Sequence, residues 1–225
     1  IVGIIGLNEC LQFMIGKELH DDDEALKLGL RIISHMYFKV KEEGKKHNLK
    51  FSLEESPAES ASRRLAKIDV RNYPEAVDMV KGHMERDEFY YTNSVHLRPD
   101  APVDMVKRIE VQSMFHGMIE SGAIIHAFVG EERPPASSIM KLVKRTFENT
   151  QAAQLTISPE FTICNSCNRV IPRLVDQCPH CDVSNLYSIK RNATPDRVNN
   201  WDRTKMQELV DRHEEKVTAS NKSCK

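Results

Sequence analysis

The sequence has no long apolar run and no excess of charge of either sign. Its longest apolar stretch, residues 1–7, is far shorter than the roughly 20 residues that a membrane-spanning helix needs. No charged region precedes that stretch, as one does in a signal peptide. The 32 basic and 33 acidic side chains are interspersed, and neither a polybasic tract nor an acidic tail indicates a charged partner. We therefore expect a cytoplasmic protein that contacts neither a membrane nor nucleic acid directly.

The chain does have the composition of an ordinary globular protein. Of its 225 residues 40% are apolar and 29% are charged, which is enough apolar material for the core of one domain or slightly more. It begins with Ile1 instead of methionine, directly inside a predicted buried strand. We therefore expect Ile1 to be a cut edge and the natural protein to be longer.

Strand and helix patterns alternate along most of the chain. Apolar, β-branched residues at 1–6 predict a strand that leads directly into a helix over 7–16. After the acidic segment 20–25, apolar residues recur at three- and four-residue steps and predict a long amphipathic helix. Because parallel strands need crossovers of this length, the alternation predicts an α/β fold with ligand-binding loops at the carboxyl ends of the strands. Further strands are predicted at 49–56, 88–97, 123–130 and 154–158, and further helices at 57–69, 102–121 and 136–151.

Beyond Pro159 the pattern changes to turns and cysteines, so a domain boundary is expected near residue 160. Two Cys-x-x-Cys pairs can direct four thiolates to one ion, which predicts a closed tetrahedral site for structural zinc. A segment with so few apolar residues needs such a metal to fold. The alternatives are four unmetallated thiols, a redox-active thiol pair, or His180 in place of one cysteine. The predicted metal ligands are Cys164, Cys167, Cys178 and Cys181.

Five stretches carry one family resemblance: IVGIIGLNECLQ (1–12), FSLEESPAESASRRLAKID (51–69), YYTNSVHLRPDAP (90–102), ESGAIIHAFVGEE (120–132) and NTQAAQLTISPEFTICNSC (149–167). Together they resemble the C-terminal part of the anaerobic (class III) ribonucleoside-triphosphate reductases, which are glycyl radical enzymes. The resemblance runs in order over nearly the whole chain and includes the start of the cysteine motif.

The resemblance implies a fold, a reaction and partners. Residues 1–160 would be the second half of a ten-stranded α/β barrel, residues 161–190 a ribbon-like zinc module, and residues 191–225 a tail where the radical loop is expected. The family reduces ribonucleotides to deoxyribonucleotides for DNA replication, with structural zinc and a glycyl radical as cofactors and with ATP binding. The implied partners are ribonucleoside triphosphates, a radical-SAM activating enzyme, formate or a thiol reductant, and a second copy in a homodimer.

Small and hydroxyl-bearing residues follow the strand predicted at 49–56, at a turn into a helix where free amides and the helix dipole favour an anion. We hypothesise that this segment surrounds the nucleotide phosphates. A second segment is expected near the sugar or its loops, namely Tyr91, Thr92, Asn93 and Ser94. The alternatives are an ordinary capped helix start and a buried strand with satisfied polar groups. Cys10 is interpreted as a packed small apolar residue and not as a radical carrier. The residues proposed for the phosphates are Ser56, Ala58, Glu59, Ser60, Ala61 and Ser62.

The tail departs from the family pattern. The family carries its radical on a glycine between the zinc module and a Trp-containing helix, but no glycine follows Gly130 in this chain. Asn192, Ala193 and Thr194 stand where it is expected, and the family's thiyl cysteine lies upstream of the matching segment, so both catalytic positions are unassigned. Three explanations are open: the loop is deleted or altered in an inactive chain, another polypeptide supplies the radical, or the segment carries an error or an engineered change. The competing functions are an inactive nucleotide-binding paralogue and a zinc-ribbon binding module.

Overall fold

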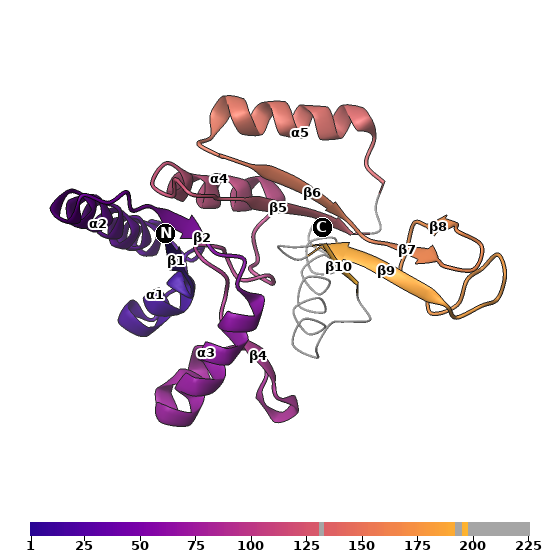
Figure 1. Cartoon of the computed structure of the whole chain (residues 1–225), viewed down its shortest axis with the longest axis horizontal. Helices are drawn as coiled ribbons and strands as arrows, with labels where there is room; N and C mark the ends of the chain where they lie inside the picture. Colours follow the sequence, from indigo (N-terminus) through magenta and orange to yellow (C-terminus); the bar gives the residue numbers. More distant parts are fainter. Residues whose placement is uncertain (131–132, 192–194, 198–225) are drawn as a thin grey trace, which may run out of the picture.

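Parallel strands joined by helices form the larger part of the computed structural model (Figure 1). The structure describes residues 1–130, 133–191 and 195–197. The paired strands are β1 (Val2–Ile4) with β2 (Leu53–Glu55), and β5 (Ile125–Gly130) with β6 (Leu155–Pro159). Backbone hydrogen bonds from residues 121 and 55 to the carbonyls of residues 53 and 122, at 3.0 and 2.9 Å, connect β2 to the segment before β5. The α/β class predicted from the alternation is therefore confirmed.

Helices provide the crossovers between these strands. Helix α1 (Leu7–Ile15) lies between Gly6 and Gly16, whose φ values of 75° and 68° are left-handed and favour glycine. Helix α2 (Asp23–His47) begins at Asp22, whose carboxylate accepts a hydrogen bond from the backbone of the first turn. The others are α3 (Glu59–Asn72), α4 (Met105–His116) and α5 (Ala136–Asn149). Four of the five lie within or close to a range that the sequence predicts as helical, whereas α2 continues to His47 through the polar segment at 41–48, where the sequence predicts its end.

The strand predicted over 88–97 is wrong beyond residue 90. Strand β4 (Glu88–Tyr90) pairs with β3 (Lys81–His83) in a short hairpin, and residues 91–97 form a loop. The loop turns because Ser94 adopts a left-handed φ of 48°, while the carbonyls of Thr92 and Ser94 accept hydrogen bonds from the backbone at the start of α1. The sequence patterns do not predict β3 or two short 3-10 helices, η1 (Pro74–Asp78) and η2 (Met84–Arg86).

The main core lies where α1, α2 and α4 pack against β1 and β2. Gly29 allows this close packing, because a Cβ atom there would lie 2.8 Å from the Leu19 side chain. The buried apolar residues of the cluster are Ile4, Leu7, Leu11, Leu19, Leu26, Ile33, Leu53, Val95, Leu97, Ala101, Val111, Phe115, Ile119 and Ala123. In the described part of the chain no helix is both long and apolar enough to cross a bilayer.

A four-stranded antiparallel sheet follows β6 after one intervening residue and lies at the opposite end of the molecule from α2 (Figure 1). Its strand order is β10-β9-β7-β8. The four strands are β7 (Phe161–Cys164), β8 (Val170–Ile171), β9 (Leu186–Arg191) and β10 (Pro195–Arg197). The division into domains at residues 160 and 190 stays a prediction.

Candidate functional site

Four thiols converge in the small sheet. The sulfur atoms of Cys164, Cys167, Cys178 and Cys181 all lie within 4.8 Å of one another. The Sγ atoms are 3.6 Å apart for Cys164 and Cys181, and 3.7 Å apart for Cys167 and Cys178. A tetrahedral zinc ion with Zn–S bonds of about 2.3 Å would place its sulfur ligands about 3.8 Å apart. The cysteine cluster therefore has the donor atoms and the spacing to hold a zinc ion.

The two halves of the cluster repeat one backbone geometry. In each, the backbone N–H of the first cysteine donates to a carbonyl five residues later, at 3.0 Å for Cys164 and 3.1 Å for Cys178. A left-handed residue occupies the same place in both turns, Asn168 with φ 54° and Asp182 with φ 53°. Such turns direct backbone N–H groups at sulfur, and the N–H of Cys167 is the largest cause that lowers the pKa of Cys164 to about 6. This turn therefore favours the thiolate form of Cys164, whereas burial is the largest cause that raises the pKa of Cys181 to about 12.

His180 does not belong to the cluster. It is exposed, and its Nδ1 accepts a hydrogen bond from the Arg169 guanidinium at 2.9 Å. The sulfur atoms alone complete the group of four donors. A metal ion with four protein ligands has no open position for a substrate, so an ion bound here would have a structural role.

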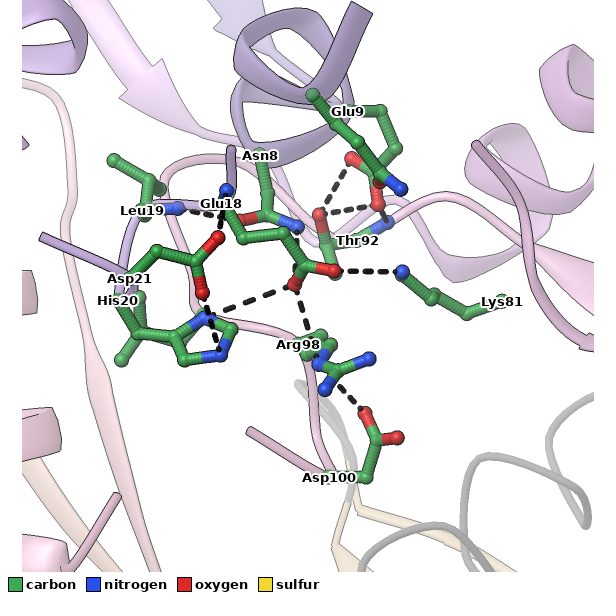
Figure 2. A network of polar contacts seen from close by, with 12 residues as sticks. Asn8, Glu9, Glu18, Leu19, His20, Asp21, Lys81, Thr92, Arg98 and Asp100 are labelled. Atoms are coloured by element: carbon green, nitrogen blue, oxygen red, sulfur yellow. Dashed lines mark hydrogen bonds and ion pairs between the residues drawn. The ribbon is translucent and has the colours of Figure 1, made fainter. Parts of the chain in front are cut away.

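A second cluster of polar groups lies at the carboxyl end of β1 (Figure 2). The Glu9 carboxylate, on the first turn of α1, is buried and accepts hydrogen bonds from Thr92, at 2.9 Å from N–H and 2.6–2.8 Å from Oγ1. Burial raises the pKa of Glu9, although the hydrogen bonds from Thr92 act in the opposite direction. A carboxyl group in such a place can take or give a proton.

An ion-pair network holds the residues beside Glu9 in place (Figure 2). The buried Asn8 amide donates to Glu18 at 3.2 Å and accepts from the backbone N–H of Leu19 at 3.0 Å. Glu18 in turn pairs with Lys81 at 2.9 Å and with Arg98 at 3.2 Å. The start of α1 is thus fixed to the β3 strand and to the loop that follows β4.

The segment predicted to bind phosphate lies at the same end of the strands. Ser56 follows β2 and contacts β1 so closely that a Cβ atom on Gly3 would lie 2.1 Å from the Ser56 hydroxyl. Ala58 is the N-cap of α3, and the helix has no hydrogen bond from a capping side chain. The alternative interpretation of this segment, an ordinary capped helix start, is therefore not supported by a side-chain cap.

The other predicted residues of this segment lie in the first turn of α3. Ser60 is exposed, Ala61 is half-buried, and Ser62 is buried with its backbone N–H donating to Ala58 O at 2.8 Å. Glu59 is the first helical residue. Ser60 is therefore a hydroxyl that a ligand can reach and a mutation can change without disturbing the core.

Asn93 lies across β1 from Ser56. Ile4 pairs with Glu55 on one side of β1, and Ile5 forms an isolated bridge with Asn93. The Oδ1 atom of Asn93 is buried and has no hydrogen-bond partner among the described residues. A buried acceptor without a partner costs free energy, which a bound donor would recover.

The sequence patterns did not indicate a functional role for Glu9, and the prediction for the adjacent Cys10 was wrong. Cys10 is exposed, with its thiol 3.8 Å from the Met14 sulfur, so its interpretation as a packed residue is wrong. Position 10 lies on the outer side of α1, whereas position 9 points to Thr92. A signal for Glu9 was available, since it is the one charged residue among the first 16.

A family model and curated relatives of this chain all carry the same description. A family model described as anaerobic ribonucleoside-triphosphate reductase matches residues 1–214. The chain is 25% identical over 204 residues to the enzyme of that name from Enterobacteria phage T4, a match that covers 85% of this chain and 30% of the phage protein. It is 25% identical over 126 residues to the one from Haemophilus influenzae, which covers 56% of this chain and 17% of that protein.

Solved structures share the fold. An anaerobic ribonucleotide reductase superimposes with a TM-score of 0.70 at 16% identity, over 93% of this chain and 31% of that one. The enzyme from Thermotoga maritima, crystallised with dATP and CTP, gives a TM-score of 0.70 at 17% identity, over 95% and 33%. The chain thus spans about a third or less of the length of these relatives. Because the family model extends over nearly its whole length, the chain belongs to the anaerobic ribonucleoside-triphosphate reductase family.

Proposed function

We propose that this chain is part of an anaerobic ribonucleoside-triphosphate reductase, an oxidoreductase that converts ribonucleotides to deoxyribonucleotides by radical chemistry. The observation that carries the proposal is the family match over residues 1–214. Residues 1–160 would supply the second half of a ten-stranded barrel, and residues 161–190 a zinc module. The tail at 191–225 lies largely outside the described residues, as do Asn192, Ala193 and Thr194.

The nucleotide would bind at the carboxyl ends of β1 and β2. The uncapped amides of α3 would receive the phosphates, with Ser56, Ala58, Glu59, Ser60, Ala61 and Ser62 around them. The unpartnered Oδ1 of Asn93 supports a polar contact with the sugar. Glu9 is buried and contacts Thr92, the residue before Asn93, and it would move protons near that sugar. That the Thermotoga maritima relative was crystallised with dATP and CTP supports nucleoside triphosphates as ligands.

The partners and cofactors of the proposed enzyme follow from the family. Zinc would be held by the four cysteines and would stabilise the small sheet. A radical-SAM activating enzyme would generate the radical, formate or a thiol would supply the electrons, and two copies would form a homodimer in the cytoplasm. ATP would be among the bound nucleotides.

Substitution of Ser60 by leucine tests the phosphate site. Because Ser60 is exposed, the free energy of unfolding should change by less than about 0.5 kcal/mol. The bulky side chain would cover the amides at the start of α3, so the dissociation constant for ATP and CTP should rise by about tenfold. Isothermal titration calorimetry on the wild type and on Ser60→Leu measures both constants. Equal affinity in the two proteins would remove this segment from the proposed site.

The missing glycine favours a second candidate, a paralogue that binds nucleotide without turnover. Anaerobic treatment of the protein with the activating enzyme, S-adenosylmethionine and a reductant, followed by electron paramagnetic resonance, separates the two. A glycyl doublet is the result expected for a reductase whose radical glycine lies outside this sequence or in a partner chain. Nucleotide binding without that signal would instead identify the inactive paralogue. A zinc-ribbon binding module alone accounts for none of the match over the first 160 residues.

A further inference from the structure

A buried carboxylate occupies the last position of β2, directly before the proposed phosphate segment. The Glu55 side chain is 2% exposed. Its Oε2 accepts a hydrogen bond from the backbone N–H of Ile124 at 2.8 Å and lies 3.3 Å from Nε2 of His96. Its Oε1 lies 3.8 Å from Nε2 of His116, at the end of α4. One carboxylate thus contacts three segments that are distant in sequence.

The neighbours of the two histidines define where their hydrogens lie. Nε2 of His96 is 3.3 Å from the Glu55 carboxylate and 3.2 Å from the Ile124 carbonyl, and because both oxygens are acceptors this nitrogen carries a hydrogen. Nδ1 of His116 accepts from the backbone N–H of Ala153 at 2.9 Å, so neutral His116 carries its hydrogen on Nε2, toward Glu55. Both imidazoles therefore present N–H groups to the carboxylate.

The Glu55–His96 contact joins the two segments that carry the proposed nucleotide residues. Glu55 is bonded to Ser56, and the backbone N–H of His96 donates to Asn93 O at 3.0 Å, which closes the turn around Ser94. We propose that Glu55 and His96 form a positioning pair that holds Ser56 and Asn93 in a fixed relative arrangement. This inference rests on the nucleotide site proposed above and gives that site a second layer of residues that need not touch the ligand.

Charge strengthens the pair. Burial lowers the pKa of His96, but the Glu55 carboxylate opposes this and the pKa lies above its ordinary value. Burial raises the pKa of Glu55, but protonated His96 and the Ile124 amide lower it below the ordinary value. Each partner is therefore charged over a wider pH range than it would be alone.

Other groups facing the pair act more weakly or against it. Arg108 on α4 lowers the pKa of His96, and the ring of His126 on β5 lies 6.2 Å from the His96 ring. Burial lowers the pKa of His116, so this side chain favours the neutral form. His116 is thus a neutral ring that faces Glu55 at 3.8 Å, too far for a hydrogen bond, and His96 is the cation of the pair.

The pH range of the pair follows from the two shifts. Stabilisation by His96, whose pKa is raised, is complete below the ordinary histidine pKa and is lost as the pH rises through the raised value. Stabilisation by Glu55, whose pKa is lowered, is present above the ordinary carboxyl pKa and is lost as the pH falls through the lowered value. Between these limits the two segments should stay in their fixed arrangement.

A pH titration followed by NMR tests the pair without any ligand. As the pH rises, the backbone amide resonances of Ser56 and Asn93 should titrate with the same midpoint as the His96 ring. In Glu55→Gln that midpoint should fall, and the shared titration of Ser56 and Asn93 should be lost. The variant Glu42→Gln, which removes an exposed partner of Lys39 on α2, should titrate like the wild type. Amides of Ser56 and Asn93 that do not follow the His96 ring in the wild type would overturn the proposal.

Nucleotide affinity provides the functional readout. Glu55→Gln and His96→Gln should each raise the dissociation constant for ATP and CTP by about tenfold, and the double variant by no more than either single one. Unchanged affinity in a folded Glu55→Gln protein would contradict a positioning role. If the wild type binds neither nucleotide, the proposed function fails, whereas the shared titration still decides whether the pair couples the two segments.

Discussion

Replacement of Cys167 by serine is expected to abolish tight zinc binding and to unfold the small sheet of β7 to β10. Among the described residues of this segment the buried apolar ones are Cys164, Ile171, Cys178 and Leu186, and burial of so few side chains cannot alone offset the entropy of ordering the segment. A structural zinc site contributes about 10 kcal/mol or more of folding free energy in modules of this kind, so a bound zinc ion would be the largest stabilising term here.

The measurement combines metal analysis with hydrogen exchange. The wild type should retain one zinc per chain after dialysis and protect the amides of residues 161–186, whereas Cys167→Ser should lose both the metal and the protection. Chelation of the wild type should reproduce the exchange pattern of the variant. Cys10→Ser is the matched control, since Cys10 is exposed and stands apart from the cluster, and it should bind zinc like the wild type. Full zinc retention in Cys167→Ser would contradict a four-cysteine site.

Local patterns in the sequence were sufficient to predict the helices, the parallel strands and the cysteine cluster. Helix α2 has both a regular apolar spacing and an Asp22 cap, and each signal lies within a few neighbouring residues. The four cysteines come as two short pairs, and the doubled spacing itself indicates a common ion. These features were predictable because the physical cause of each is contained in one short segment.

The polar contacts of the candidate site were not predictable in this way. Glu9 contacts Thr92 from 83 positions away, and Glu55 contacts His96 and Ile124 from 41 and 69 positions away. No periodicity links residues at such separations, and only the folded chain brings them together. The error in the strand predicted over 88–97 has the same origin, because only residues 88–90 pair with a neighbouring strand, and the carbonyls of Thr92 and Ser94 accept hydrogen bonds from the start of α1.

Replacement of Phe115 by alanine is expected to cost roughly 3–5 kcal/mol of unfolding free energy, a large part of the total stability of a typical domain. Phe115 is fully buried where α4 meets α2. Its ring lies close to Gly29 on α2, because a Cβ atom added to Gly29 would be 3.5 Å from the ring. Removing the ring leaves a cavity that this close-packed interface cannot fill by small movements. Urea denaturation followed by circular dichroism measures the change.

Phe38→Ala is the control for that experiment, because the Phe38 side chain is 67% exposed and its loss should change the unfolding free energy by less than about 0.5 kcal/mol. Equal effects of the two substitutions would show that the interface of α2 and α4 does not form the core. The position of Phe115 also connects stability to the site, since His116 follows it directly and faces Glu55. A milder change, Phe115→Leu, should therefore weaken nucleotide binding only if it moves the end of α4. The nucleotide affinity of this variant thus measures how firmly the core holds the site.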